Sequence, residues 1–159
     1  MDAPVAVFDL DGVIADASHR QHFLDASHNR DKDWKGFFQA CIDDVAIPEG
    51  KALAEAMRVD MTVVVLTARI HETREKTIHW LATNEVRHDW LIMRGPRSTT
   101  PSSQWKKDQL EALQGAGADI RIALDDDPLN ITMMHELGLP ALYVHSGYYV
   151  HGGFDVEFR

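Results

Sequence analysis

Two carboxylates stand close together near the start of the chain, at Asp9 and Asp11, with Gly12 after them. They follow residues 5–8, an apolar run without polar interruption, which is typical of a strand buried on both faces. Acids this close repel one another unless a proton or a cation separates them. Mg²⁺ prefers oxygen ligands and would suit such a pair. The plainer alternative is an acidic turn, because Asp and Gly are common turn residues.

Polar side chains also follow two later apolar runs, at residues 62–66 and 120–124. They are Thr67 and Arg69, on either side of Ala68 with its backbone N–H, after the first run and Asp125 and Asp126 after the second. The carboxyl ends of parallel strands meet at one edge of a sheet, and ligands bind beyond that edge. We therefore expect the polar residues that follow the three strands to form one site rather than three separate turns.

Apolar runs alternate with helical patterns along most of the chain, which predicts an α/β fold with a doubly wound parallel sheet. The expected strands lie at 5–8, 62–66, 90–93, 120–124 and 141–144. One expected helix begins at Pro48, and three more lie at 72–84, 104–114 and 128–137. Their inward side chains are expected to include Leu53, Ala56, Met57, Ile78, Leu81 and Ala82.

Residues 15–48 interrupt this alternation with a polar, mixed segment, which we expect to form a small helical cap over the site. A chain of 159 residues is most simply one domain, spanning 1–159. The tail at 145–159 has no clear period and stays unassigned.

The acidic pattern fits the transfer of a phosphoryl group. Asp9, directly at the strand end, is placed to attack phosphorus and form an aspartyl-phosphate that water hydrolyses. Asp11, on the turning loop, is placed to protonate the leaving alcohol and then to deprotonate that water. Asp125 and Asp126 would complete the oxygen shell of a Mg²⁺ ion held with these acids. The hydroxyl and backbone N–H of Thr67 would bind phosphoryl oxygens.

Lys106 is the cation that we expect to face this site. It shares a helical stripe with Leu110 and Leu113, whereas Lys107 shares one with Glu111. Lys106 therefore points inward, where its ammonium group would bind the substrate, and Lys107 points to solvent. Further candidates for a local basic pocket are Arg69, Arg74, Arg94 and Arg97, and Arg20 follows the first acidic loop closely enough to reach a substrate.

The chain has 16 basic and 25 acidic residues, a formal net charge of −9. This balance opposes extensive wrapping by nucleic acid, but a phosphorylated small molecule or a nucleic-acid end needs only a local basic pocket. The single cysteine, Cys41, rules out an internal disulfide and is expected to be a small core residue. No run of about eighteen apolar residues occurs, so we expect a cytoplasmic protein without a membrane span.

The motifs resemble those of the haloacid dehalogenase superfamily, in the same order and over most of the chain. They are DLDGV at residues 9–13, Thr67 after VVVL, Lys106 opening a later helix, and LDDD at residues 124–127. The resemblance implies a Mg²⁺-dependent phosphotransferase fold in which Asp9 is the nucleophile and Asp11 the general acid and base. Thr67 and Lys106 would then be phosphate ligands, and one of the acids after the fourth strand would bind the metal. The second acid, at Asp11, resembles the phosphatase branch rather than the dehalogenase branch.

Within that superfamily, three segments look most like the phosphatase domain of bacteriophage polynucleotide kinase-phosphatases. They are DWKGFF at residues 33–38, TAR at 67–69 and ALDDD at 123–127. Those enzymes remove 3′-phosphates from nucleic-acid ends. No Gly-rich phosphate-binding loop ending in Lys-Ser/Thr occurs, so we expect no kinase half. A 5′(3′)-nucleotidase or another small-metabolite phosphatase fits the same motifs, and a non-catalytic phosphate-binding module is the alternative of another class.

The aromatic residues of the cap segment have two interpretations. Trp34, Phe37 and Phe38 could stack on a base, but their helical spacing favours packing within the cap. We expect Trp80 and Trp90 to lie in the core between the sheet and its helices.

The histidines and one arginine are also open to more than one interpretation. His19, His22 and His28 lack a compact ligand pattern and are expected to be surface or cap residues. Arg69 is expected either to bind phosphate or to pair with Asp126. The sequence does not indicate an oligomeric state.

Overall fold

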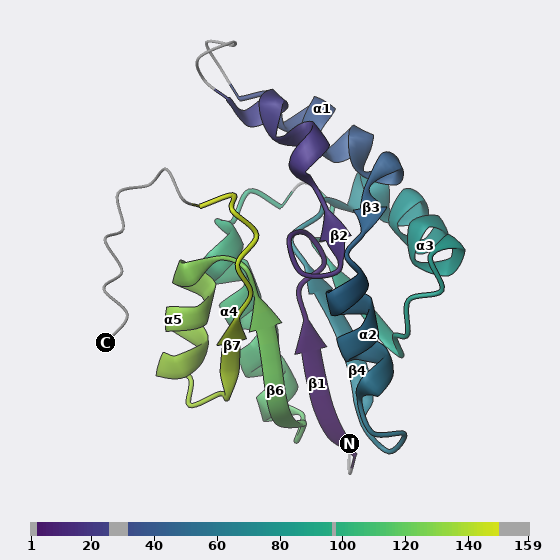
Figure 1. Cartoon of the computed structure of the whole chain (residues 1–159). Helices are drawn as coiled ribbons and strands as arrows, with labels where there is room; N and C mark the ends of the chain where they lie inside the picture. Colours follow the sequence, from purple (N-terminus) through teal and green to yellow (C-terminus); the bar gives the residue numbers. More distant parts are fainter. Residues whose placement is uncertain (1–2, 26–31, 97, 150–159) are drawn as a thin grey trace.

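A five-stranded parallel sheet forms the centre of the computed structural model, which describes residues 3–25, 32–96 and 98–149 (Figure 1). The strands lie in the order β5, β4, β1, β6, β7, and each neighbouring pair is parallel. Their bounds are Pro4–Phe8 for β1, Thr62–Thr67 for β4, Trp90–Met93 for β5, Asp119–Asp125 for β6 and Ala141–Tyr143 for β7. The predicted doubly wound α/β fold is confirmed, with β1 in the middle of the sheet.

Two layers of helices cover the sheet, one on each face. The helices are α2 (Pro48–Ala56), α3 (Arg74–Thr83, preceded by the 3₁₀ helix η3, His71–Thr73), α4 (Ser102–Gly115) and α5 (Pro128–Glu136). Successive residues of a strand point to opposite faces. Ala6 and Phe8 pack in one core cluster with residues of α2 and α3, whereas Val5 and Val7 pack in another with residues of α4 and α5. Both faces of β1 are therefore buried, which explains its uninterrupted apolar sequence.

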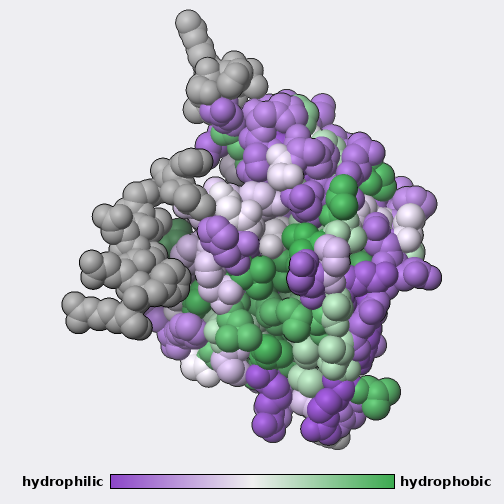
Figure 2. Space-filling model, viewed as in Figure 1, coloured by the Kyte–Doolittle hydropathy of each residue, from purple (hydrophilic) through white to green (hydrophobic). Residues whose placement is uncertain are grey.

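The chain between β1 and α2 forms a small structure of its own at the carboxyl ends of the strands (Figure 1). It contains β2 (Ala15–Asp16), the 3₁₀ helix η1 (Ser18–Leu24), α1 (Trp34–Gln39), the 3₁₀ helix η2 (Ala40–Asp43) and β3 (Val45–Ala46), which pairs with β2. We call the described residues of 15–47 the cap. Figure 2 shows that its outer surface is mainly hydrophilic.

The buried faces of α2 and α3 differ from those predicted. In α2, Leu53 is 43% exposed, and the helix is buried through Gly50 and Ala54 instead. A Cβ atom at Gly50 would overlap the carbonyl oxygen of Val13, so the absence of a side chain lets α2 approach the loop after β1. In α3, Leu81 is buried as predicted, but Ile78 is 46% exposed. Of the three remaining predicted inward residues, Ala56 and Ala82 are exposed, whereas Met57 is partly buried and packs against the core.

The two tryptophans predicted for the core have different environments. Trp80 is buried on α3, as predicted, whereas Trp90 lies on the edge strand β5 and is 47% exposed. Cys41 is buried in the cap, which confirms its predicted place as a small core residue. Among the described residues, no helix is long and apolar enough to cross a membrane.

Candidate active site

Three buried carboxylates meet at the carboxyl edge of the sheet. Asp9 follows β1, Asp125 ends β6, and Asp126 comes directly after it. The register of β1 on β6 brings them together, because Phe8 lies opposite Leu124 and the backbone N–H of Asp9 donates to the Leu124 carbonyl at 2.9 Å. Each of the three acids offers one oxygen within 4.8 Å of the others. The structure therefore brings together three of the acids that the sequence predicts for one site.

Lys106 supplies a cation to this cluster from α4. Its Nζ lies 2.9 Å from Oδ2 of Asp9 and 2.6 Å from Oδ2 of Asp125, and its side chain is almost wholly buried. Burial opposes the charged form, but Asp125 and Asp9 hold the pKa of Lys106 above its ordinary value. The inward orientation predicted from the helical stripe is confirmed. The side chain of Lys107 is 41% exposed, in agreement with its predicted outward orientation.

The acid cluster carries more negative charge than Lys106 balances. Burial raises the pKa of Asp9 well above its usual value, and the charges of Asp125 and Asp126 raise it further against the effect of Lys106. Burial, with the nearby charge of Asp125, raises the pKa of Asp126 to about 7. Within the described residues, Oδ2 of Asp126 is buried and accepts no hydrogen bond. A buried oxygen without a partner beside two more carboxylates fits a hard divalent cation, which would stabilise the ionised forms.

Gly12 makes room for this cluster. Its φ is 81°, in the left-handed region, and a Cβ atom there would overlap the carboxylate of Asp126. The glycine of the DLDGV motif therefore lets the loop after β1 turn close to the acids that follow β6.

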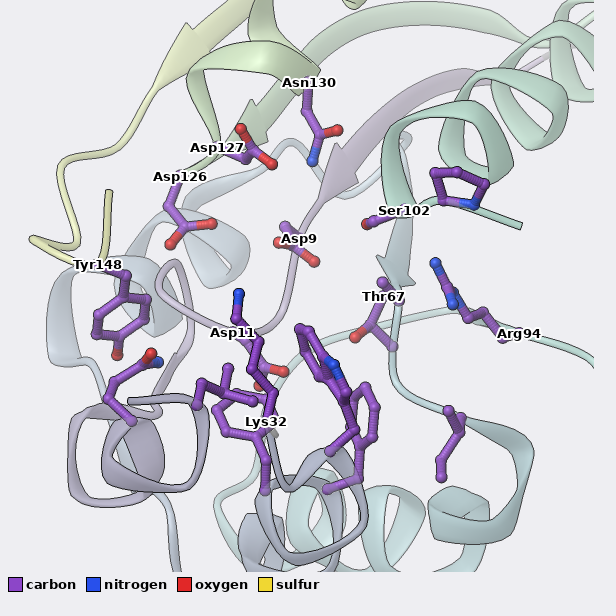
Figure 3. Close-up of a pocket in the computed structure, with 18 of the residues that line it drawn as sticks. Asp9, Asp11, Lys32, Thr67, Arg94, Ser102, Asp126, Asp127, Asn130 and Tyr148 are labelled. Atoms are coloured by element: carbon purple, nitrogen blue, oxygen red, sulfur yellow. The ribbon is translucent and has the colours of Figure 1, made fainter. Parts of the chain in front are cut away.

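Polar groups that can bind a phosphoryl group lie on the other side of Asp9. Figure 3 shows Thr67, Ser102 and Arg94 on one side of Asp9 and the acids that follow β6 on the other. Thr67 ends β4 and lines the same pocket as Asp9 and Ala68. Within the described residues, Nε of Arg94 is buried without a hydrogen-bond partner. Burial lowers the pKa of this guanidinium group, which an anion would counteract.

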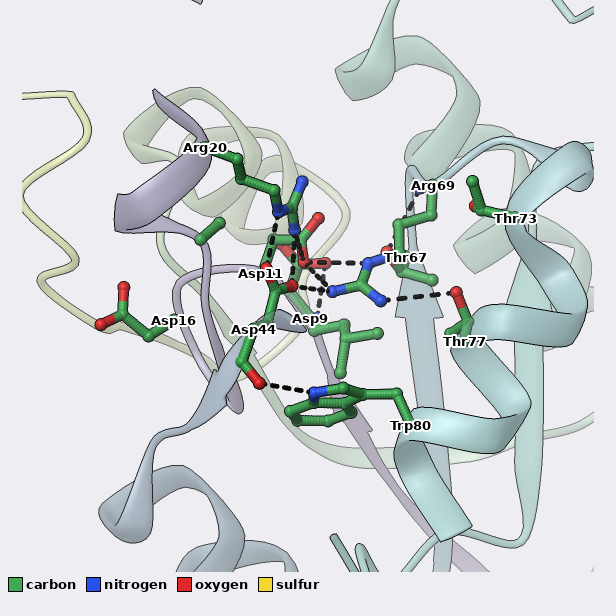
Figure 4. Close-up of polar contacts among 12 residues, drawn as sticks. Asp9, Asp11, Asp16, Arg20, Asp44, Thr67, Arg69, Thr73, Thr77 and Trp80 are labelled. Carbon is green, nitrogen blue, oxygen red and sulfur yellow. Dashed lines mark hydrogen bonds and ion pairs between the residues drawn. The ribbon is translucent and has the colours of Figure 1, made fainter. Parts of the chain in front are cut away.

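Asp11 lies in a different electrostatic setting from Asp9 (Figure 4). Its Oδ1 accepts hydrogen bonds from Nη2 of Arg20 at 2.7 Å and from Nη2 of Arg69 at 2.6 Å. Burial alone would raise the pKa of Asp11, but Arg69 and Arg20 hold it below its usual value. The carboxylate of Asp11 does not join the group of close acids that contains Asp9, so the prediction that it helps to bind the metal is not supported.

Asp44 of the cap holds both arginines in place. It accepts from Nε of Arg20 at 2.7 Å and from Nη2 of Arg69 at 2.5 Å, and all three side chains have no exposed area. The indole N–H of Trp80 donates to the Asp44 carbonyl at 2.7 Å. This closed network of two cations and two anions ties the cap to the loop that carries Asp11.

The arginines predicted as substrate ligands have another position in the structure. Arg20 and Arg69 are fully buried and are not among the residues that line the described pocket, so the structure does not support them as substrate ligands there. The alternative pairing of Arg69 with Asp126 is also wrong, because Arg69 pairs with Asp11 and Asp44. The physical reason is the cap carboxylate of Asp44, which offers a buried site for both guanidinium groups.

One large pocket extends from the acids to the cap. Its volume is about 1210 Å³, and its lining includes Asp9, Thr67 and Lys106 on the side of the sheet. Trp34 lines it from the cap, where it packs against Phe37 and Phe38 as predicted but stays 49% exposed. Tyr149, in the tail that the sequence left unassigned, also lines it.

Several residues of this region were not predicted from the sequence. Asn130 donates to Oδ1 of Asp125 at 3.0 Å and so orients that carboxylate. Ser102 lines the pocket at the start of α4. Tyr148 ties the tail to the cap, since its hydroxyl donates to Oδ1 of Asp16 at 3.0 Å and accepts from the backbone N–H of Ala17 at 2.7 Å. Of these, only Asn130 carried a sequence signal, because it lies within the first turn after an acidic strand end.

The other basic and histidine candidates lie in different places, and His22 lines the described pocket. Arg94 and Lys106 line the described pocket, whereas Arg74 and Lys107 do not. Arg97 and His28 lie outside the described residues. His19 pairs with Asp44 at 2.9 Å.

Comparison with solved structures supports the fold, because several proteins of known structure are similar to this chain. The chain is similar to a chain in a structure of the Pnkp1/Rnl/Hen1 RNA repair complex, with a TM-score of 0.72 and 24% identity over 91% of this chain and 43% of that one. It also resembles a class C acid phosphatase from Bacillus anthracis with tungstate bound (TM-score 0.57, 16% identity, 79% and 53% covered). A third is a HAD family enzyme from Bacteroides thetaiotaomicron in a magnesium complex (TM-score 0.54, 14% identity, 90% and 93% covered).

Comparison with sequence families gives the assignment. No curated protein sequence matches the chain. The chain spans less than half the length of the Pnkp1 complex chains that it matches. The family model of the polynucleotide kinase PNKP phosphatase domain matches residues 3–149. The chain therefore belongs to the family of PNKP phosphatase domains and is a phosphatase of the haloacid dehalogenase superfamily.

Proposed function

We propose that the protein is a Mg²⁺-dependent phosphomonoesterase that works through an aspartyl-phosphate and removes 3′-phosphates from nucleic-acid ends. The observation that carries the proposal is the arrangement of two neighbouring acids with opposite environments. Asp9 lies beside Lys106, Asp125 and Asp126. Asp11, two residues away, forms ion pairs with two arginines instead. Two carboxylates with different surroundings can take two different chemical roles.

Asp9 is the proposed nucleophile. One of its carboxylate oxygens attacks phosphorus, and the bond from phosphorus to the leaving oxygen breaks. The Asp9 backbone N–H is committed to Leu124, and Oδ1 accepts from the backbone N–H of Leu10 at 2.8 Å. These contacts fix the carboxylate at the strand end, facing the pocket. Lys106 and the hydroxyl of Thr67 are the proposed phosphate ligands, because both line the pocket beside Asp9.

Asp11 is the proposed general acid and base. In the first step it gives a proton to the leaving oxygen, although Arg69 and Arg20 lower its pKa and leave only a small protonated fraction at neutral pH; in the second it accepts a proton from the water that attacks the aspartyl-phosphate. Phosphate then leaves, and both acids return to their starting states. Arg20 and Arg69 would orient Asp11 for both transfers without contacting the substrate.

Asp9, Asp125 and Asp126 are the residues that would hold Mg²⁺. The fit rests on their mutual distances within 4.8 Å and on the unpartnered Oδ2 of Asp126. When bound, the ion would neutralise negative charge on the carboxylate and phosphoryl oxygens. The HAD family enzyme similar to this chain was solved as a magnesium complex, which supports the choice of metal.

A nucleic-acid end is the proposed substrate. The support is membership of the PNKP phosphatase family and similarity to a chain of an RNA repair complex. The pocket of about 1210 Å³ has room for more than a phosphate group. The formal net charge of −9 favours binding of one end rather than a long duplex. We propose that the cap closes one side of this pocket and selects the leaving group.

Phosphate release tests the proposed function. We expect Mg²⁺-dependent release from a 3′-phosphorylated oligonucleotide, with slower release from nucleoside monophosphates and sugar phosphates. Asp9→Asn should lower the rate by at least about a thousandfold. Asp119→Asn is the control, because Asp119 is half exposed and pairs with Arg121 away from the pocket. Undiminished turnover in Asp9→Asn would refute the nucleophile, and a preference for mononucleotides would identify a nucleotidase instead.

A further inference from the structure

We propose that the exposed face of the Trp34 indole ring binds the base of the terminal nucleotide, so that the cap recognises a nucleoside as the leaving group. The proposal rests on the proposed function, because it takes this pocket as the place where the phosphoryl group is transferred. It assigns to Trp34 a role in substrate selection that is separate from the chemistry at Asp9.

The position of Asp11 sets the side on which the leaving group lies. A general acid must be within hydrogen-bond reach of the oxygen that it protonates, so the leaving group extends from phosphorus past Asp11. Arg20 donates to Asp11, and the central carbon of its guanidinium group lies 4.2 Å from the centroid of the Phe37 ring. The aromatic side chains of the cap, starting with Phe37, therefore lie beside the path of the leaving group.

Three rings form one cluster on this side of the pocket. Trp34 lies edge-on to Phe37, with centroids 6.0 Å apart, and nearly parallel to Phe38, with centroids 5.9 Å apart and planes 27° apart. All three residues line the pocket. Phe37 is only 7% exposed and packs within the cap, as its helical spacing predicts. Trp34 is 49% exposed, so part of its ring surface remains available for a ligand.

A flat base is the ligand that this surface fits. Bases stack on aromatic side chains irrespective of sequence, because every base has a π face. A sugar phosphate has no such face and would leave the indole surface in water. A pocket of about 1210 Å³ also has more space than a phosphate and a small sugar need.

Two cations lie where further phosphates of a nucleic-acid strand could bind. The ammonium group of Lys32 lies over the Trp34 ring, 5.6 Å from its centroid, so a base that stacks on this face must displace Lys32; Lys32 and Arg94 both line the pocket. Figure 3 shows the two side chains on different sides of Thr67, so they flank the entrance to the acids. Local positive groups of this kind can bind a strand end although the protein as a whole is acidic.

Paired substrates test the role of Trp34. The two oligonucleotides carry the same 3′-phosphate and differ only in whether the last sugar bears a base or is abasic. Trp34→Ala should lower kcat/KM for the substrate with the terminal base by about 5- to 150-fold and change kcat/KM for the abasic one less than about twofold. Trp34→Phe should restore much of the loss, because Phe retains an aromatic face.

Trp90→Ala is the matched control. Trp90 is 47% exposed, almost as much as Trp34, but it lies on β5 and does not line the described pocket. This variant should hydrolyse both substrates at the wild-type rate. An equal loss on both substrates in Trp34→Ala, or no loss on either, would overturn the proposal.

Failure of the proposed function would look different. In that case the wild-type protein would release no phosphate from either oligonucleotide, with or without Mg²⁺. Equilibrium binding of the same two oligonucleotides, measured by calorimetry, would then still decide the role of Trp34. Tighter binding of the one with the terminal base, lost in Trp34→Ala, supports it, and equal affinities contradict it.

Discussion

Replacing Asp44 by Asn should destabilise the protein by about 3–5 kcal/mol, the cost of removing one member of a buried ion pair. Asp44 has no exposed side-chain area and accepts three bonds of 2.5–2.8 Å from Arg20 and Arg69. The substitution keeps the volume and removes the charge, so in the described part of the chain Asp11 is the one carboxylate left to balance two buried guanidinium groups. Since the free energy of unfolding of a domain is typically about 5–15 kcal/mol, such a loss is easily measured.

Urea unfolding of the wild type and the variant at neutral pH measures this difference. Asp60→Asn is the control, because Asp60 is 52% exposed and pairs with Arg58 at the surface. Surface ion pairs contribute roughly 0–1 kcal/mol, so this variant should stay close to the wild type. If Asp44→Asn lost no more stability than Asp60→Asn, the buried network would not hold the cap as we infer.

The same variant should also reduce the fraction of Asp11 that carries a proton. With Asp44 neutral, both arginines face Asp11 alone and hold its pKa still further below its usual value. An alkyl leaving group needs the proton of Asp11, so its release should slow by up to about 10²–10⁴-fold. Release of p-nitrophenol, which leaves readily without a proton, should slow much less. Equal losses on the two substrates would mean that the network has only a structural role.

Two further predictions concern the acid cluster. The metal-free protein should lose roughly 4 kcal/mol of stability as the pH rises from about 4 to about 7, because folded Asp126 keeps its proton up to pH about 7 whereas the unfolded chain releases it near 3.8. Thermal unfolding at several pH values should show this fall, and Mg²⁺ should reverse it at pH 8; a flat profile would contradict the shifted pKa. Gly12→Ala should weaken Mg²⁺ binding at least about tenfold, because its Cβ would overlap Asp126. Gly117→Ala has the same left-handed φ but open space around it, so calorimetry should give it unchanged affinity, and equal losses would exclude a steric effect at the cluster.

The site residues at the carboxyl edge of the sheet could be predicted from the sequence, because local rules determine their positions. Asp9, Asp125 and Thr67 all lie at the ends of apolar runs, and parallel strands bring their carboxyl ends to one edge. The inward side of Lys106 followed from its spacing to Leu110 and Leu113, both of which are buried. Strand ends and helical periods are properties of a few neighbouring residues.

The network behind Asp11 could not be predicted in this way. Its arginines are 24 and 25 residues from Asp44, on opposite sides of it in the chain, and no local pattern links them. Which acid forms an ion pair with each arginine depends on how the cap folds over the sheet. The interpretation of Arg69 as a ligand of phosphate or a partner of Asp126 therefore missed its actual partners.

Helical spacing indicated which residues share a side but not what that side faces. Phe37 and Trp34 share one side of α1, yet Phe37 packs against Arg20 whereas Trp34 is half exposed in the pocket. In α2, the small residues Gly50 and Ala54 face the protein because the backbone approaches closely there. A scale that places large apolar residues inside favours Leu53 instead, which is 43% exposed.

Trapping the phosphorylated protein tests the central claim most directly. The protein is mixed with a 3′-³²P-phosphorylated oligonucleotide and Mg²⁺, quenched in acid and digested with trypsin, and the labelled peptide is sequenced by mass spectrometry. We expect the phosphate on Asp9, no label in Asp9→Asn, and a larger labelled fraction in Asp11→Asn, because that variant lacks the base for hydrolysis. Phosphate release without any labelled protein, or a label on a residue other than Asp9, would contradict the proposed mechanism.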